Sequence, residues 1–172
     1  MHGQVMSFLK AELQRSPQHA LPGVRVLELG SRDINGSPRS CFPAPAYYLG
    51  IDCHSGPGVD VVGVVHEILN SRSCEPFVVV VSTEMLEHDP FWTQTLCASV
   101  SLLKPGGLFL LSCASRKRGA HHLEDSPVPG HYQGLNPEDL LPVLHRLALW
   151  ESLDGWTARG DLDTFICGKV GA

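Results

Sequence analysis

A glycine and an acid follow two short apolar segments of the chain, at a spacing that suits a nucleoside ligand. Gly30 comes directly after the apolar run 24–29, where a glycine lets a ligand approach the backbone closely. Asp52 comes directly after the second apolar run, 47–51, some two dozen residues after the first. An acid at that place and spacing can accept both hydroxyl hydrogens of a ribose. The pyrophosphate-binding pattern G-x-G-x-x-G is absent, because Arg32 stands at its second glycine position. The spacing therefore favours a nucleoside ligand over a dinucleotide.

Glu84, Glu87 and His88 form a second group of residues that could do chemistry. On a helix, spacings of three and four place them on one face. Two carboxylates and an imidazole can hold Mg²⁺ or another divalent ion, which would lower the pKa of a substrate hydroxyl. In the alternative interpretation, the two acids stabilise a helix N-terminus and His88 makes a buried hydrogen bond. A further metal ligand would come from the loop that follows, at His121, His122 or His131.

These residues require a sheet whose strands end at one edge, and the apolar pattern predicts such a sheet. The run 77–81 is continuously apolar and largely β-branched, which is typical of a strand covered on both faces. Connections too long for hairpins indicate mostly parallel strands with helices on both faces, and a final pair that can form an antiparallel edge. The predicted strands are 24–29, 47–51, 59–65, 77–81, 108–112, 149–156 and 164–167, and the predicted helices are 5–14, 93–103 and one that begins at 136.

Length and composition exclude several classes of protein. The chain has 172 residues, 43% hydrophobic and 18% charged, which predicts one globular domain. A net charge of −5 argues against a general nucleic-acid or membrane-surface binder, and no apolar run approaches the length of a membrane span. The first 16 residues lack a signal-peptide pattern, and the six cysteines are scattered without metal or redox spacing. A cytoplasmic location is the expectation.

Four short motifs follow one another along the chain. They are Val-Leu-Glu-Leu-Gly at 26–30, Gly-Ile-Asp at 50–52, Val-Ser-Thr-Glu-Met-Leu-Glu-His at 81–88 and Leu-Lys-Pro-Gly-Gly-Leu-Phe at 103–109. In this order they resemble the class I S-adenosylmethionine-dependent methyltransferases, most closely the small-molecule group called methyltransferase type 11. The resemblance implies a Rossmann-like three-layer α/β sandwich around a mostly parallel, seven-stranded sheet with an antiparallel last strand.

The resemblance also implies a cofactor site for S-adenosylmethionine. Asp52 would bind the ribose hydroxyls, and residues after the first and fourth strands would flank the methionine part and the sulfonium. The implied cofactor-binding residues are Glu28, Gly30, Ser31, Arg32, Asp52, Cys53, Ser82, Thr83 and Glu84. The chain departs from the family at the glycine-rich loop, where Arg32 and Ile34 replace glycines, and at 64–66, where an acid near the adenine is missing.

In such proteins the segment after the fifth strand borders the acceptor site. The polar stretch 114–135 is that segment here, and His131 or Tyr132 is the predicted general base. The alternative for its basic run, 116–118, is a solvated charge cluster on a loop. The E-x-x-E-H pattern at 84–88 is similar to that of ubiquinone-pathway O-methyltransferases and of enzymes that methylate the terminal 2′-hydroxyl of small RNAs.

The leading hypothesis is therefore methyl transfer from S-adenosylmethionine to an oxygen or nitrogen of a small-molecule acceptor, by a monomer or homodimer without nucleic-acid or membrane partners. The alternatives are a metal-assisted RNA 2′-O-methyltransferase and a methyltransferase-like binding module without activity. The predicted single domain spans 1–172. It divides into an N-terminal helix and turn (1–21), a cofactor-binding core (22–115), an acceptor-side loop (116–135) and a C-terminal helix with strands (136–172).

Overall fold

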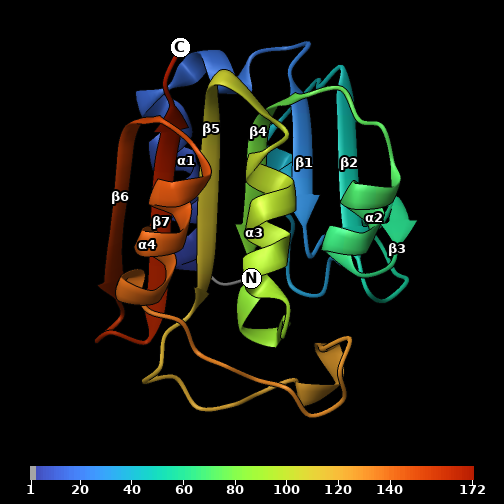
Figure 1. Ribbon diagram of the computed structural model, residues 1–172, viewed down its shortest axis with the longest axis vertical. Coiled ribbons are helices and arrows are strands. Elements are labelled where there is room, and N and C mark those ends of the chain that lie inside the picture. Colours follow the sequence, from blue (N-terminus) through green and yellow to red (C-terminus); the bar gives the residue numbers. More distant parts are fainter. Residues whose placement is uncertain (1–2) are drawn as a thin grey trace.

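The computed structural model describes residues 3–172, which fold around one seven-stranded sheet (Figure 1). The strand order is β3-β2-β1-β4-β5-β7-β6, and β7 is antiparallel to both of its neighbours. The strands are β1 Arg25–Leu29, β2 Tyr47–Asp52, β3 Val61–Val62, β4 Phe77–Thr83, β5 Leu103–Ala114, β6 Trp150–Ala158 and β7 Asp163–Val170. The predicted mostly parallel sheet with an antiparallel last strand is confirmed.

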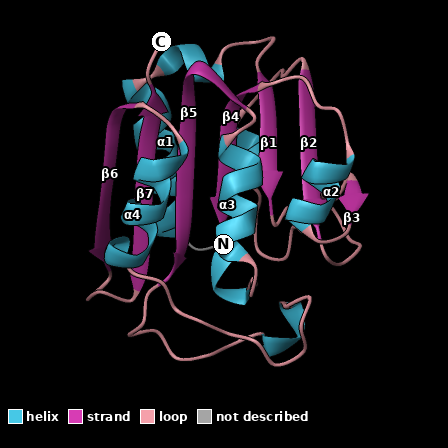
Figure 2. Cartoon of the chain, viewed as in Figure 1, coloured by secondary structure: helices cyan, strands magenta, loops and turns pink. Residues whose placement is uncertain are grey.

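Helices cover both faces of the sheet, which gives three layers (Figure 2). Three α-helices lie on one face, while α1 and a 3-10 turn, η2, lie on the other. The α-helices are α1 Gly3–Arg15, α2 Val65–Ser71, α3 Trp92–Val100 and α4 Pro137–Leu147. The 3-10 helices are η1 Pro17–Ala20, η2 Pro38–Cys41, η3 Leu86–His88 and η4 Leu123–Asp125. Within residues 3–172, no helix combines the length and the apolar character needed to cross a bilayer.

The central strand β4 shows why this sequence forms a buried sheet. Its side chains alternate between the two hydrophobic clusters, with Val80 in the cluster under α2, α3 and α4 and Val79 and Val81 in the cluster under α1. All three side chains are fully buried. A continuous β-branched run is therefore required at this position, because both faces of the strand lack contact with water.

The structure shortens one predicted strand and leaves the β1–β2 connection without an α-helix. The predicted strand 59–65 is wrong in length, since only Val61–Val62 pair with β2 and Val65 already begins α2. Gly63 has a φ of +155°, which takes the chain out of the strand and turns it into the helix. Between β1 and β2 only the short turn η2 forms, because Pro38, Pro43 and Pro45 prevent a regular α-helix.

A partly buried polar network lies where η2 covers β1 and β2. The hydroxyl of Tyr48 donates a hydrogen bond of 2.7 Å to Glu28, and the guanidinium of Arg39 stacks 4.2 Å above the Tyr48 ring. Arg39 also forms an ion pair with Asp60, whose carboxylate accepts the amide of Gly50 at 2.7 Å. Burial raises the pKa of Glu28 to about 8, although the Tyr48 hydrogen bond and the Arg39 charge offset part of this effect.

Leu111→Ala should lower the free energy of unfolding by about 2–5 kcal/mol, because this fully buried side chain on β5 would leave a cavity. The matched control is Leu149→Ala, whose side chain is 89% exposed and whose effect should stay within about 0.5 kcal/mol. Urea denaturation of both variants measures the difference. Equal effects of the two substitutions would contradict the described core.

Glu28→Gln should flatten the pH dependence of stability. The pKa of Glu28 is higher in the folded chain than in the unfolded chain, so its stabilising contribution is complete below the unfolded pKa of about 4.3. That contribution is lost as the pH rises toward 8. Between about pH 5 and pH 8.5 the wild type should lose roughly 4 kcal/mol more than the variant.

Denaturation at several pH values measures this loss, and the exposed acid Glu138 provides the control variant, Glu138→Gln. Other buried acids are present in both proteins and cancel in the comparison. A Glu28→Gln curve parallel to that of the wild type would show that Glu28 is not the group responsible.

Candidate functional site

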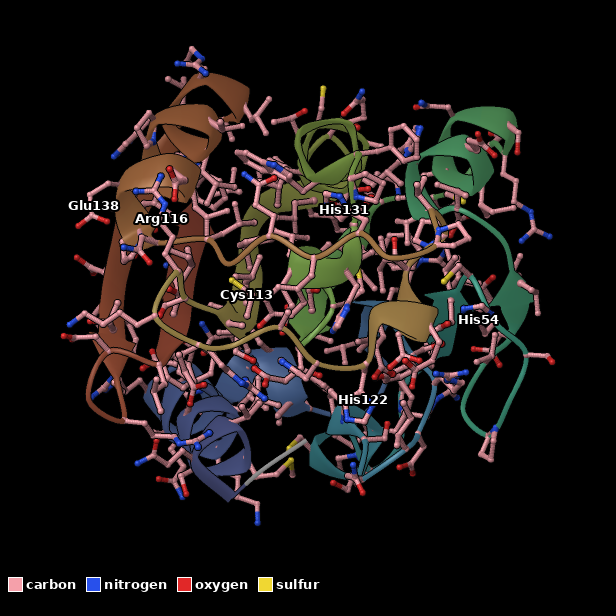
Figure 3. The ribbon with its side chains drawn as sticks, turned by 90° about the horizontal axis from the view of Figure 1, so that it is seen from below. His54, Cys113, Arg116, His122, His131 and Glu138 are labelled. Carbon is pink, nitrogen blue, oxygen red and sulfur yellow. The ribbon has the colours of Figure 1, made fainter. Side chains whose placement is uncertain are left out.

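A cavity of about 440 Å³ lies at the carboxyl ends of β1, β2 and β4. Viewed from below, the loop between β5 and α4 crosses this end of the sheet and brings η4 beside His54 (Figure 3). The cavity is thus bounded by strand ends on one side and by this loop on the other. Pockets at the carboxyl ends of parallel strands, next to the point where strand order reverses, are the usual ligand sites of such sheets.

Most of the residues predicted to bind a cofactor line this cavity. Ser31 and Ser82 do not line it, because both side chains are buried beside it and are at most 1% exposed. The lining members of the predicted set are Glu28, Gly30, Arg32, Asp52, Cys53, Thr83 and Glu84.

Asp52 presents its carboxylate to the cavity from the end of β2. One oxygen accepts the amide of Arg32 at 3.1 Å and the other accepts the amide of His54 at 2.9 Å. These two bonds fix the carboxylate, while each oxygen keeps a second lone pair for a ligand. The arrangement is therefore an oriented acceptor for a pair of hydroxyl groups.

Gly30 is required by both its conformation and its surroundings. Its φ is +74°, and a Cβ at this position would lie 2.5 Å from the Cβ of Met85. Because Met85 follows β4, any larger residue would push the ends of β1 and β4 apart. The backbone of Gly30 therefore forms part of the cavity floor, packed closely against Met85.

Glu84 is held by contacts that its sequence neighbours do not predict. It adopts a left-handed φ of +54°, accepts the Ser112 hydroxyl at 3.2 Å and forms an ion pair with Arg118. Arg118 also contacts Asp163 at 3.1 Å. The expected single helical face of Glu84, Glu87 and His88 is wrong, because Glu84 lies in a turn and only 86–88 form a short 3-10 helix.

The structure brings Glu87, His88 and His121 together instead. One ligand atom from each lies within 4.8 Å of the others. Glu87 is fully buried, and neither its carboxyl oxygens nor Nδ1 of His88 has a hydrogen-bond partner among the described residues. Burial raises the pKa of Glu87, and the nearby Glu84 carboxylate adds to this effect. Burial, with His121 nearby, lowers the pKa of His88 to about 4, so its imidazole is neutral at neutral pH.

The predicted bases His131 and Tyr132 do not line the cavity, and Tyr132 lies next to this group. The Tyr132 ring is 5.3 Å from that of His88 and 5.1 Å from that of His121. Nε2 of His131 and the Tyr132 hydroxyl are buried without a hydrogen-bond partner in the described chain. Burial, together with the charge of Glu87, raises the pKa of Tyr132, so the phenol stays protonated at neutral pH. The assignment of these two residues as bases stays a prediction.

The ion pair between Arg32 and Asp125 had no signal in the sequence. These residues are 93 positions apart, and their side chains meet at the rim of the cavity. In the sequence, Arg32 is an implied cofactor-binding residue that replaces a glycine, and Asp125 is part of a polar loop. No local spacing rule joins two residues on different loops.

Known proteins resemble this chain in sequence over part of its length. A ubiquinone biosynthesis O-methyltransferase from Burkholderia thailandensis is 32% identical over an alignment of 108 positions that covers 56% of this chain and 47% of that protein. One from Saccharophagus degradans is 36% identical over 67 residues, which are 39% of this chain and 28% of that protein. The chain thus spans about half the length, or less, of the curated relatives it matches. No family model matches it.

Solved structures resemble it over nearly its whole length. A SAM-dependent methyltransferase from Archaeoglobus fulgidus has a TM-score of 0.65 at 16% identity. The match covers 95% of this chain and 93% of that protein. The 1,6-didemethyltoxoflavin-N1-methyltransferase of Burkholderia thailandensis was solved with bound 1,6-didemethyltoxoflavin and S-adenosylhomocysteine. Its TM-score is 0.66 at 17% identity, and the match covers 98% of this chain and 79% of that protein. With the observed strand order, these likenesses show that the chain has the fold of the class I S-adenosylmethionine-dependent methyltransferases.

Proposed function

We propose that the protein transfers a methyl group from S-adenosylmethionine to an oxygen or nitrogen atom of a small molecule. The observation that carries this proposal is the fixed carboxylate of Asp52 at the edge of a cavity floored by Gly30. The names of the similar proteins support it, since they are small-molecule O- and N-methyltransferases. They do not favour the alternatives of an RNA substrate or a binding module without activity.

The described residues fit such a cofactor. Asp52 offers acceptors for two ribose hydroxyls, and Gly30 lines the cavity with backbone alone. Val64, Val65 and Met85 give the cavity an apolar wall suited to a purine ring. Arg32 adds a cation to the lining, at a position where the family has glycine. The volume of about 440 Å³ falls within the usual range of about 300–1,000 Å³ for ligand pockets.

Methyl transfer from a sulfonium is an in-line displacement for which the bound cofactor supplies both the methyl group and the leaving group. The chain's own task is then to orient the two reactants and to exclude water. Asp52 orients the cofactor from the β2 side. The group formed by the buried Glu87 and His88 and the half-buried His121 lies on the β4–β5 side, where the acceptor is proposed to bind.

We further propose that Glu87, His88 and His121 can hold a divalent cation. The buried, unpartnered carboxyl oxygens of Glu87 and the neutral imidazole of His88 are the supporting observations. A cation held there would lower the pKa of an acceptor hydroxyl. Glu84 fits this set less well than the sequence pattern indicates, because Arg118 pairs with its carboxylate.

Asp52→Asn should weaken binding of S-adenosylhomocysteine by about 1–3 kcal/mol, since one charged acceptor becomes a neutral amide. Titration calorimetry measures the change. Asp154→Asn, on the exposed face of β6, is the matched control and should bind like the wild type. The proposal fails if the folded wild type does not bind S-adenosylhomocysteine.

Glu87→Gln should weaken Mn²⁺ binding by at least tenfold, because the substitution keeps the shape of the side chain and removes its charge. Binding is followed by electron paramagnetic resonance after treatment with EDTA, with Glu138→Gln as the exposed control. Equal Mn²⁺ affinity of wild type and Glu87→Gln would rule out this site. Loss of the Mn²⁺ site would leave the Asp52 result unaffected.

A further inference from the structure

One segment of the loop between β5 and α4 lies across the cavity. This segment, residues 119–130, is called the strap here. It leaves the β5 end of the sheet, reaches the β2 side near His54 and returns toward α4 (Figure 1, Figure 3). His121, His122, Asp125 and Pro127 of the strap line the cavity. A ligand in the cavity is therefore covered by this segment.

The tip of the strap is tied to the loops that follow β1 and β2. Asp125 forms an ion pair with Arg32, and the thiol of Cys53 donates to the Asp125 carbonyl at 3.2 Å. Nε2 of His54 lies 2.9 Å from the Glu124 carbonyl. All three contacts reach from η4 to the same side of the cavity.

The base of the strap is fixed independently of its tip. Arg118 bridges Glu84 and Asp163 just before the strap, and the amide of Gln133 donates to the Glu87 carbonyl at 2.8 Å just after it. A segment fixed at its base and held at its tip by a few contacts can open locally while the fold stays intact.

The contacts at the tip of the strap are linked to Asp52, the residue proposed to bind the ribose. The backbone amide of Arg32 donates to Asp52, and the side chain of Arg32 pairs with Asp125. The side chains of Arg32 and Asp125 are 24% and 18% exposed, so solvent screens the pair only in part. The position of the strap is thereby coupled to the loop that orients the Asp52 carboxylate.

We propose that the strap is a lid over the cavity and that the ion pair between Arg32 and Asp125 is its latch. Opening the latch releases η4 from Cys53 and His54 and uncovers the cavity for ligand entry and exit. The identity of that ligand rests on the proposed function, whereas the opening itself can be measured without any ligand.

The labelling rate of Cys53 by N-ethylmaleimide, read by peptide mass spectrometry, measures opening directly, because this thiol lies under the tip. Both Asp125→Asn and Arg32→Gln should raise the rate at least fivefold. Cys41, on η2, is the internal reference and should react as in the wild type.

The two variants separate opening from a change in thiol acidity. Asp125 raises the pKa of Cys53, and Arg32 lowers it. Both effects are smaller than the increases caused by burial and by the neighbouring Asp52. A purely electrostatic effect would therefore speed labelling in Asp125→Asn and slow it in Arg32→Gln. Faster labelling in both supports the lid. Opposite changes, or unchanged rates, would overturn it.

The control Asp161→Asn removes an exposed ion pair with Lys117 outside the strap and should leave the rate of Cys53 labelling unchanged.

A second measurement tests whether opening of the lid controls release of the ligand. Dissociation of S-adenosylhomocysteine, followed by stopped flow, should be at least fivefold faster in both latch variants than in Asp161→Asn. Unchanged dissociation would contradict a gating role. If the wild type does not bind S-adenosylhomocysteine, the proposed function fails, and the Cys53 labelling rates still decide whether the strap opens.

Discussion

The close approach of the chain at the ends of β1, β2 and β4 is the constraint on which the rest of the site depends. A Cβ on Gly30 would lie 2.5 Å from Met85, and one on Gly50 would lie 2.6 Å from the Gly58 carbonyl. The strand ends can pack this closely only because both positions lack a side chain. The same packing places the Asp52 carboxylate beside the cavity, where two amides orient it.

The connections around this tight edge are made by polar contacts more than by regular helices. Between β1 and β2 a turn and the network of Glu28, Tyr48 and Arg39 take the place of a packed helix. On the opposite side, Arg118 joins the loop after β5 to Glu84 and Asp163. These charged contacts fix the positions of the loops that surround the cavity.

The sheet could be predicted because its strands carry their signals locally. The β-branched run of β4, the glycine after β1 and the acid at the end of β2 are readable without any knowledge of tertiary structure. The short strand β3 and the left-handed turn at Glu84 could not be predicted, since Gly63 and the contacts of Glu84 with Ser112 and Arg118 decide them. The sequence pattern groups Glu84 with Glu87 and His88 and offers three loop histidines as further ligands. The fold brings one of these, His121, to Glu87 and His88, while Glu84 pairs with Arg118.

The central claim is that a nucleoside cofactor occupies the cavity between the strand ends and the loop above them. Hydrogen–deuterium exchange with and without S-adenosylhomocysteine tests it most directly. The account predicts slower exchange in the segments after β1, β2 and β4 and in residues 119–130, with β6 and α4 unchanged. Protection confined to other segments, or none at saturating ligand, would contradict it.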